Sequence, residues 1–224
     1  MSAAEKFNVY TLVMAVVAIF LGVTELAPYL NATFGVHATL AVSVLTSVGI
    51  YRALAAFFGQ VIQRFGPLFR VLMGPAYVCG TWGGLIYTKT GQPRIIVEKY
   101  EQTLGGVKVF GQSFFLDQRK DANWSTQAVQ VHEKEGFLVG VYSVNVPDKQ
   151  TIEAYGKLDF DRSDSRDGPT AMTGYTIDAD ATQKLHYYRL VKLSNKLLDI
   201  DEARRQTFKA FDGEVQRLRG TEKV

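Results

Sequence analysis

The chain has 224 residues, with 25 Lys or Arg against 22 Asp or Glu, giving a formal net charge of +3. This balance is too mild to indicate wrapping by DNA or RNA, so no nucleic-acid polymer is expected as a partner. The single cysteine, Cys79, excludes an intrachain disulfide framework.

Two long apolar segments at the start of the chain predict a transmembrane helical hairpin over residues 1–58. Residues 9–27 carry one charge, Glu25, and residues 36–58 carry one, Arg52. A helix needs about 20 mostly apolar residues to cross a bilayer. A cleaved signal sequence and a pair of buried soluble helices are the alternatives. The lack of a polar stripe in both segments and the lack of a good cleavage site favour the membrane hairpin.

The distribution of Lys and Arg around the hairpin predicts its orientation. The turn between the two segments, which contains Pro28 and Gly35, has neither residue type. Lys6 precedes the first segment, and Arg64 and Arg70 follow the second. By the positive-inside rule, we expect a multi-pass protein with both termini in the cytoplasm.

Residues 59–79 form a basic, apolar connector that Gly-Pro steps interrupt at 66–67 and 74–75. It is either an interfacial segment with its arginines at the level of lipid phosphates, or a linker packed on the following domain.

From residue 80 to 193, short β-rich runs alternate with turns rich in Gly, Asp, Asn and Pro. Most turns have hairpin length, which predicts an up-and-down antiparallel order. Eight such strands can close into a small barrel of the lipocalin or streptavidin kind, which removes exposed sheet edges. An open sheet or a sandwich is the alternative. The predicted strands are 80–88, 94–103, 107–116, 124–132, 137–145, 152–161, 170–177 and 183–193.

Residues 194–224 predict a C-terminal helix, over 196–218, and a tail. The spacing of Phe208, Phe211, Val215 and Leu218 gives this helix one apolar seam. The seam packs either on the barrel or on a neighbouring subunit.

Trp82 and Arg189 predict how one end of the barrel closes. Gly80 allows a sharp entry into the first strand, and Trp82 two residues later is expected to plug the interior. On the last strand, Arg189 is expected to stack its guanidinium on Trp82.

The stretch from Pro75 to Tyr87 contains the pattern P-x-x-x-x-G-T-W-x-G-x-I. With two preceding membrane helices and an eight-strand domain, it resembles the two-transmembrane β-barrel effectors of bacterial cyclic-oligonucleotide anti-phage signalling (CBASS). Residues 112–131 are similar to that family's paired strands around a polar turn, and residues 170–193 to its closing hairpin. The resemblance covers residues 9–193 and leaves the C-terminal helix unmatched.

The resemblance implies a function without catalysis. The barrel would bind a cyclic dinucleotide made by a partner nucleotidyltransferase, and binding would promote homo-oligomerisation in the bacterial inner membrane. The assembly would disrupt that membrane, so that the infected cell dies before phage matures. We accordingly expect no enzymatic activity, catalytic residues, cofactor or metal site. The sequence itself has no phosphate loop, nucleophile motif or ligand-spaced His or Cys cluster.

A dianionic ligand needs Lys or Arg for its phosphates and aromatic side chains for its bases. Turn lysines and arginines, strand aromatics and two polar strand residues meet this need. The candidates are Tyr87, Lys89, Gln112, Ser113, Arg119, Lys120, Trp124, Tyr142 and Tyr175. Two other functions stay open: a membrane-anchored lipocalin-like carrier of an apolar ligand, and a non-enzymatic membrane adaptor whose C-terminal helix recruits a partner.

Overall fold

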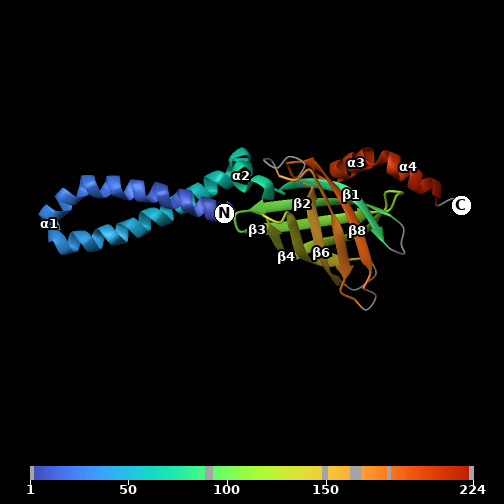
Figure 1. Cartoon of the computed structure of the whole chain (residues 1–224), viewed down its shortest axis with the longest axis horizontal. Helices are drawn as coiled ribbons and strands as arrows, with labels where there is room; N and C mark the ends of the chain where they lie inside the picture. The colour runs from blue at the N-terminus through green and yellow to red at the C-terminus, as the bar shows by residue number, and fades with distance from the viewer. Residues whose placement is uncertain (1–2, 89–92, 148–150, 162–167, 181–182, 222–224) are drawn as a thin grey trace. The chain divides into compact units, whose positions relative to one another are not determined.

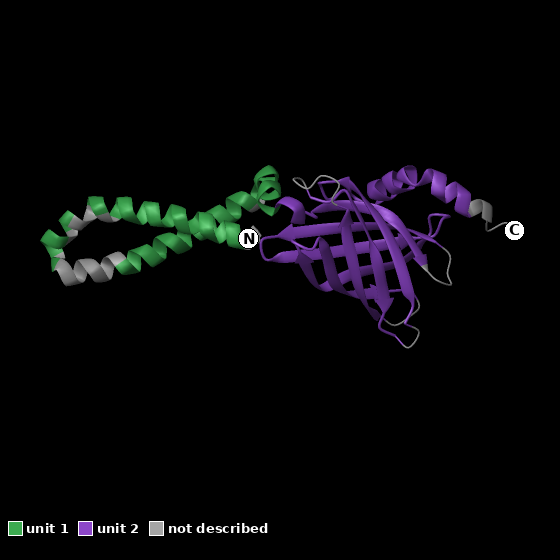
Figure 2. Ribbon diagram, in the orientation of Figure 1, with its two compact units in different colours: residues 1–73 green, residues 74–224 purple. Residues whose placement is uncertain are grey.

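The structure is a computed structural model of the whole chain and describes residues 3–88, 93–147, 151–161, 168–180 and 183–221. It divides into two compact units, residues 1–73 and 74–224, which Figure 2 shows in green and purple.

The first unit is a helical hairpin followed by a short helix. Helix α1 (Ala3–Arg64) consists of two arms that meet at Gly35, whose backbone is not helical (φ 76°, ψ 167°). Pro28, predicted as part of the turn, lies inside the first arm, so the turn is tighter than the sequence suggested. Positive φ favours glycine, which explains why the chain reverses at Gly35. Helix α2 (Gly66–Met73) buries Phe69, Leu72 and Met73.

Both arms of α1 are apolar enough to span a membrane, over residues 5–22 and 44–62. Most of their large apolar side chains are exposed; Tyr10 and Phe20, for example, are each 66% exposed. In the first arm, the small side chains of Thr11 and Ala15 are buried. Small residues at these positions are typical of helices that pack closely together.

The second unit is a closed, eight-stranded antiparallel barrel in which each strand pairs with the next and β8 pairs with β1 (Figure 1). The prediction of an up-and-down barrel is confirmed, and the open sheet and sandwich are excluded. The strands are β1 (Gly80–Thr88), β2 (Arg94–Thr103), β3 (Gly106–Phe114), β4 (Lys120–His132), β5 (Phe137–Asn145), β6 (Ile152–Asp161), β7 (Ala171–Asp178) and β8 (Leu185–Ser194).

Alternation along the strands divides side chains between the interior and the outer wall. The interior holds one large apolar cluster that includes Trp82, Ile96, Leu138, Leu158 and Leu190. Successive side chains of a strand point to opposite faces, so the neighbours of these residues lie on the outer wall.

Two C-terminal helices, α3 (Ile200–Ala210) and α4 (Asp212–Thr221), replace the single predicted helix. The break falls at Phe211, which caps α3 with a non-helical backbone (φ −109°, ψ 16°). The predicted apolar seam packs on the barrel: Phe211 and Val215 are buried against Leu85 and Ile95 of the outer wall.

Candidate functional site

A fully buried carboxyl group lies in the barrel interior at Glu98, which is 1% exposed. The Tyr100 hydroxyl donates to Glu98 Oε2 at 2.7 Å, and Trp124 Nε1 donates to Oε1 at 2.9 Å. Burial raises the pKa of Glu98 to about 7, although the two hydrogen bonds act in the opposite direction. The interior therefore contains an acid that can exchange a proton near neutral pH.

Tyr142 and Tyr188 extend this cluster toward the barrel end where β5 finishes and β8 begins. The Thr176 hydroxyl donates to the Tyr188 hydroxyl at 3.4 Å. Burial raises the pKa of Tyr142 and Tyr188, and the nearby Glu98 carboxylate raises both further. These tyrosines remain neutral hydrogen-bonding groups at physiological pH.

Two aromatic rings of this cluster pack directly against glycines. A Cβ at Gly111 would lie 2.0 Å from the Trp124 ring, and one at Gly156 would lie 3.0 Å from the Tyr142 ring. Glycine is needed at these positions because the rings occupy the space that a side chain would fill. The described interior side chains are therefore packed against one another as a core.

The closure of the barrel end beside Gly80 differs from the prediction in one residue. Trp82 is fully buried there, as expected, and its Nε1 donates to the Val78 carbonyl at 2.9 Å. The cation beside it belongs to Lys192, whose Nζ lies 5.2 Å from the Trp82 ring centroid. The prediction that Arg189 stacks on Trp82 is wrong.

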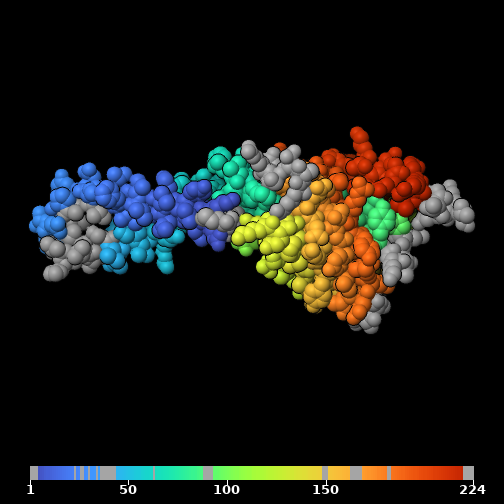
Figure 3. Space-filling view, in the orientation of Figure 1, coloured from blue at the N-terminus to red at the C-terminus, as the bar shows by residue number. Residues whose placement is uncertain are grey.

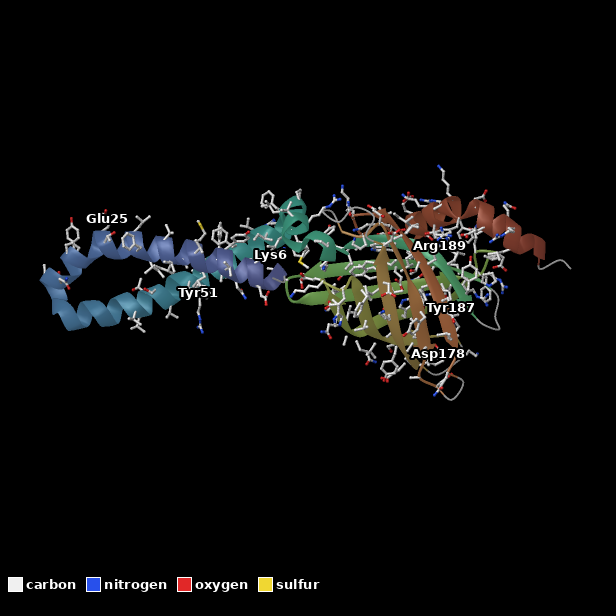
Figure 4. The ribbon with its side chains drawn as sticks, viewed as in Figure 1. Lys6, Glu25, Tyr51, Asp178, Tyr187 and Arg189 are labelled. Carbon is white, nitrogen blue, oxygen red and sulfur yellow. The ribbon has the colours of Figure 1, made fainter. Side chains whose placement is uncertain are left out.

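Arg189 points outward because it pairs in register with Leu85, an outer-wall residue of β1. Its Nη1 donates to Glu214 Oε1 of α4 at 3.0 Å, and its side chain is 57% exposed. Figure 4 labels Arg189 on β8 close to the C-terminal helices. Lys192, three residues further along β8, points to the opposite face of the strand from Arg189. It therefore completes the closure of this barrel end beside Trp82.

The segment before β1 seals this end with hydrogen bonds. Gln102 accepts from the Val78 and Cys79 amides and donates to the Ala76 carbonyl at 2.8 Å. Lys192 Nζ donates to the Tyr77 carbonyl at 3.3 Å. Trp82 and Gln102 therefore fix the entry of the chain into the barrel.

The opposite end of the barrel gathers basic turn residues. Arg94 Cζ lies 4.0 Å and Arg119 Cζ 5.0 Å from the centroid of the Phe115 ring. Arg119 pairs with Asp117 at 2.7 Å, and Arg94 pairs with Asp121 at 3.2 Å. The two guanidinium groups share one ring, and each is partly neutralised by a carboxylate.

Two other candidates lie at this end, and a third is outside the described residues. Lys120 is exposed at the start of β4. Ser113 is buried, donates to Asp121 Oδ2 at 3.2 Å and accepts from the Ala122 amide. The Ser113 hydroxyl thus ties β3 to β4. Lys89 lies outside the residues that the structure describes.

A polar groove of about 630 Å³ crosses the outer wall over β2 to β5 and includes Gln112. In the strand register, Gln112 lies opposite Asn123, and Asn123 lies opposite Asn145. A parallel row places Phe110 opposite Ser125, and Ser125 opposite Ser143. The groove therefore collects three side-chain amides and two hydroxyls from three adjacent strands.

A second, more apolar groove of about 560 Å³ lies over β4 to β7. Tyr155 and Tyr175 line it and are 53% and 40% exposed. Figure 3 shows the outer face of β6 to β8, in yellow to orange, with the red C-terminal helices along its edge. Tyr87, by contrast, is partly buried against the cluster that Phe211 and Val215 form.

The structure thus distributes the predicted ligand residues that it describes over five places. Trp124 and Tyr142 come together in the interior, Gln112 lies in the polar groove, and Tyr87 and Tyr175 lie elsewhere on the outer wall. Ser113, Arg119 and Lys120 lie at the end where β4 begins.

Sequence reasoning missed several residues of these sites: Glu98, Lys192, Lys99, Phe110 and Asn123. The available signal for Glu98 was its position directly after the apolar run 95–97, on the strand face of Ile96. The outer-wall residues had no such signal in the sequence, because only the strand register brings Phe110 and Asn123 together in one groove.

No protein-family model matches the chain, and no curated protein matches it. Its barrel is similar to redesigned β-barrels among the solved structures. One has 14% sequence identity and a TM-score of 0.42, over 54% of this chain and 96% of that one. Another, mFAP1 bound to DFHBI, has 16% identity and a TM-score of 0.40, over 53% of this chain and 98% of that one. These proteins share the barrel fold, and the similarity covers about half of this chain.

Proposed function

We propose that the chain is a membrane-anchored effector whose barrel binds a cyclic dinucleotide and whose hairpin then disrupts the bilayer. One observation carries the proposal: both long arms of α1 present large apolar side chains outward, with few of them buried. Such a surface is costly in water and favourable in lipid, where helices satisfy every backbone hydrogen bond internally. The location that follows is the bacterial inner membrane, with both termini in the cytoplasm.

The ligand class follows from the resemblance to CBASS effectors and from the polar groups of the barrel. A cyclic dinucleotide offers two planar bases and two phosphates. The described part of the barrel offers aromatic rings, uncommitted amides and a basic end where Arg94 and Arg119 share Phe115. These groups provide the stacking and charge-assisted contacts that such a ligand requires.

Activation would be a shift between a resting state and an assembled state of the hairpin. The ligand must bind the assembled state more tightly, because equal affinity for both states shifts nothing. A change from 1:99 to 99:1 would require about a 10⁴-fold difference in affinity.

The two alternatives are supported less well. A carrier of an apolar ligand needs room in the interior, whereas the described interior is packed by Trp124 and Tyr142 around the hydrogen-bonded Glu98. An adaptor that recruits a partner through its C-terminal seam needs that seam exposed, whereas Phe211 and Val215 are buried against the barrel.

The experiment uses the full chain in lipid nanodiscs, with its unfolding temperature measured against cyclic dinucleotides, cyclic trinucleotides and fatty acids. Ligand binding to the native state raises the apparent stability by mass action. We expect one cyclic dinucleotide to raise the unfolding temperature in a saturable manner. A shift with fatty acids alone would favour the carrier, and no shift with any compound would reject both ligand-binding functions.

A further inference from the structure

We infer that the polar groove over β2 to β5, on the outer wall of the barrel, holds one base and the adjoining phosphate of the ligand. The inference rests on the proposed function for the ligand class, and it assigns the site and the side chains that recognise the nucleotide. The groove has about 630 Å³, which lies within the usual range for small-molecule sites.

The strands of the groove hold three side-chain amides in place without using them in hydrogen bonds among the described residues. Gln112, Asn123 and Asn145 lie on adjacent strands in one cross-strand row. Gln112 and Asn123 are partly buried, and within the described chain none of the three side chains has a hydrogen-bond partner. Each amide offers one acceptor and two donor hydrogens that the fold leaves unused.

This row matches the hydrogen-bonding edge of a nucleobase. Bases present donors and acceptors side by side, and an Asn or Gln amide can satisfy such a pair with its oxygen and nitrogen together. Phe110, 44% exposed, lies in the neighbouring row and offers an apolar ring at the groove. Base stacking on an aromatic side chain is worth about 1–3 kcal/mol.

Lys99 supplies the positive charge of the groove. It lies opposite Phe110 in the register of β2 and β3, so the cation and the ring are adjacent. The Asp199 carboxylate is close enough for Lys99 to lower its pKa, but that carboxylate also accepts the Asp201 amide as the N-cap of α3. The Lys99 ammonium has three donors, so it can bind a phosphate oxygen while facing Asp199.

The C-terminal helix and the loop before β6 complete the walls. Ile200, the first residue of α3, and Thr151 both line the groove. These flanking residues make the outer wall of the barrel concave at this place.

The test measures the affinity of the full chain in nanodiscs for cyclic di-AMP, cyclic di-GMP and cyclic di-UMP by calorimetry. Two variants address the groove: Phe110→Ala removes the stacking ring, and Asn123→Asp keeps the shape while removing the amide donors and adding a negative charge. We expect each to weaken the binding of whichever ligand the natural chain binds by about tenfold or more.

Two controls address the other places. Tyr155→Ala removes an exposed ring from the second outer groove, and Tyr142→Phe removes a hydroxyl from the interior. Both should leave the affinity within about twofold, provided that unfolding curves show every variant to be folded. Normal binding by both groove variants, or a loss with Tyr142→Phe instead, would overturn this site and leave the proposed function standing. Binding of no cyclic dinucleotide to the natural chain would overturn both.

Discussion

At the scale of single residues, ionisation of Glu98 links barrel stability to pH. Its pKa is about 7 in the folded barrel, above its usual value of 4.5, chiefly because of burial. The folded state therefore binds the proton more tightly than the unfolded state. The contribution of Glu98 to stability is greatest below pH 4.5 and falls as the pH rises to about 7.

We predict that Glu98 alone costs the folded state about 3 kcal/mol between pH 4.5 and pH 7. The measurement is urea unfolding of the full chain in detergent micelles across this pH range. Glu98→Gln cannot ionise, so the difference between the natural chain and this variant isolates the titration. A parallel pH dependence of the two proteins would contradict the assignment, even though the variant also loses one hydrogen bond.

A second prediction concerns Gly111, which lies under the Trp124 ring. Gly111→Ala places a methyl group 2.0 Å from that ring, so the indole must move and lose its bond to Glu98. We expect a loss of about 2 kcal/mol or more in unfolding free energy and a shift in tryptophan emission. Gly213→Ala is the matched control. It meets no atom within 4 Å in α4 and should stabilise the chain by up to about 1 kcal/mol.

At the scale of elements, the predictability of each segment depended on whether its signals were local. Strands β5 and β6 begin and end where the alternation predicts. Strand β4 begins four residues earlier than predicted, at Lys120. Its polar start is stabilised by Asp121 contacts with Arg94 and Ser113, which no local pattern reveals.

The predictability of the candidate site residues likewise depended on whether their signals were local in the sequence. Trp82 was correctly predicted to lie inside because its neighbours are local turn signals. Its partner cation was not, because the pairing of β1 with β8 places Lys192, and not Arg189, opposite Trp82. The groove around Asn123 depends on pairing among four strands and was beyond the reach of one sequence.

The C-terminal helices should contribute to barrel stability as part of its core. Phe211 is 5% exposed and packs on Leu85 and Ile95. Phe211→Ala should cost about 3–5 kcal/mol of unfolding free energy, as for other buried aromatic residues. Leu197→Ala, at a position 46% exposed, should cost under about 1 kcal/mol. Similar unfolding midpoints for the two variants in urea would show that α3 and α4 are not integral to the domain.

At the scale of the whole molecule, the two units differ in the side chains that they expose. The hairpin exposes many large apolar side chains, whereas the outer wall of the barrel combines polar side chains with exposed rings such as Phe110, Tyr155 and Tyr187. The mean hydropathy of zero averages the apolar residues of the hairpin with the more polar sequence that follows it. The proposed function assigns lipid contact to one unit and ligand binding to the other.

A charged residue introduced into the hairpin should therefore abolish toxicity to cells without affecting ligand binding by the barrel. Gly22 is partly buried, and a Cβ atom added there would meet no atom of the described residues within 4 Å. We predict that Gly22→Arg leaves the affinity for the ligand unchanged and abolishes toxicity in growing cells, because a charged side chain is unfavourable within lipid. Toxicity equal to that of the natural chain would exclude the hairpin as the disruptive element.

The most direct test of the central claim is dye release from liposomes that contain the full chain. We expect intact vesicles without ligand and rapid release when a cyclic dinucleotide is added at a saturating concentration. Vesicles with Gly22→Arg should stay sealed while still binding it. If the vesicles stayed sealed with a cyclic dinucleotide that calorimetry shows to be bound, ligand-induced membrane disruption would be contradicted.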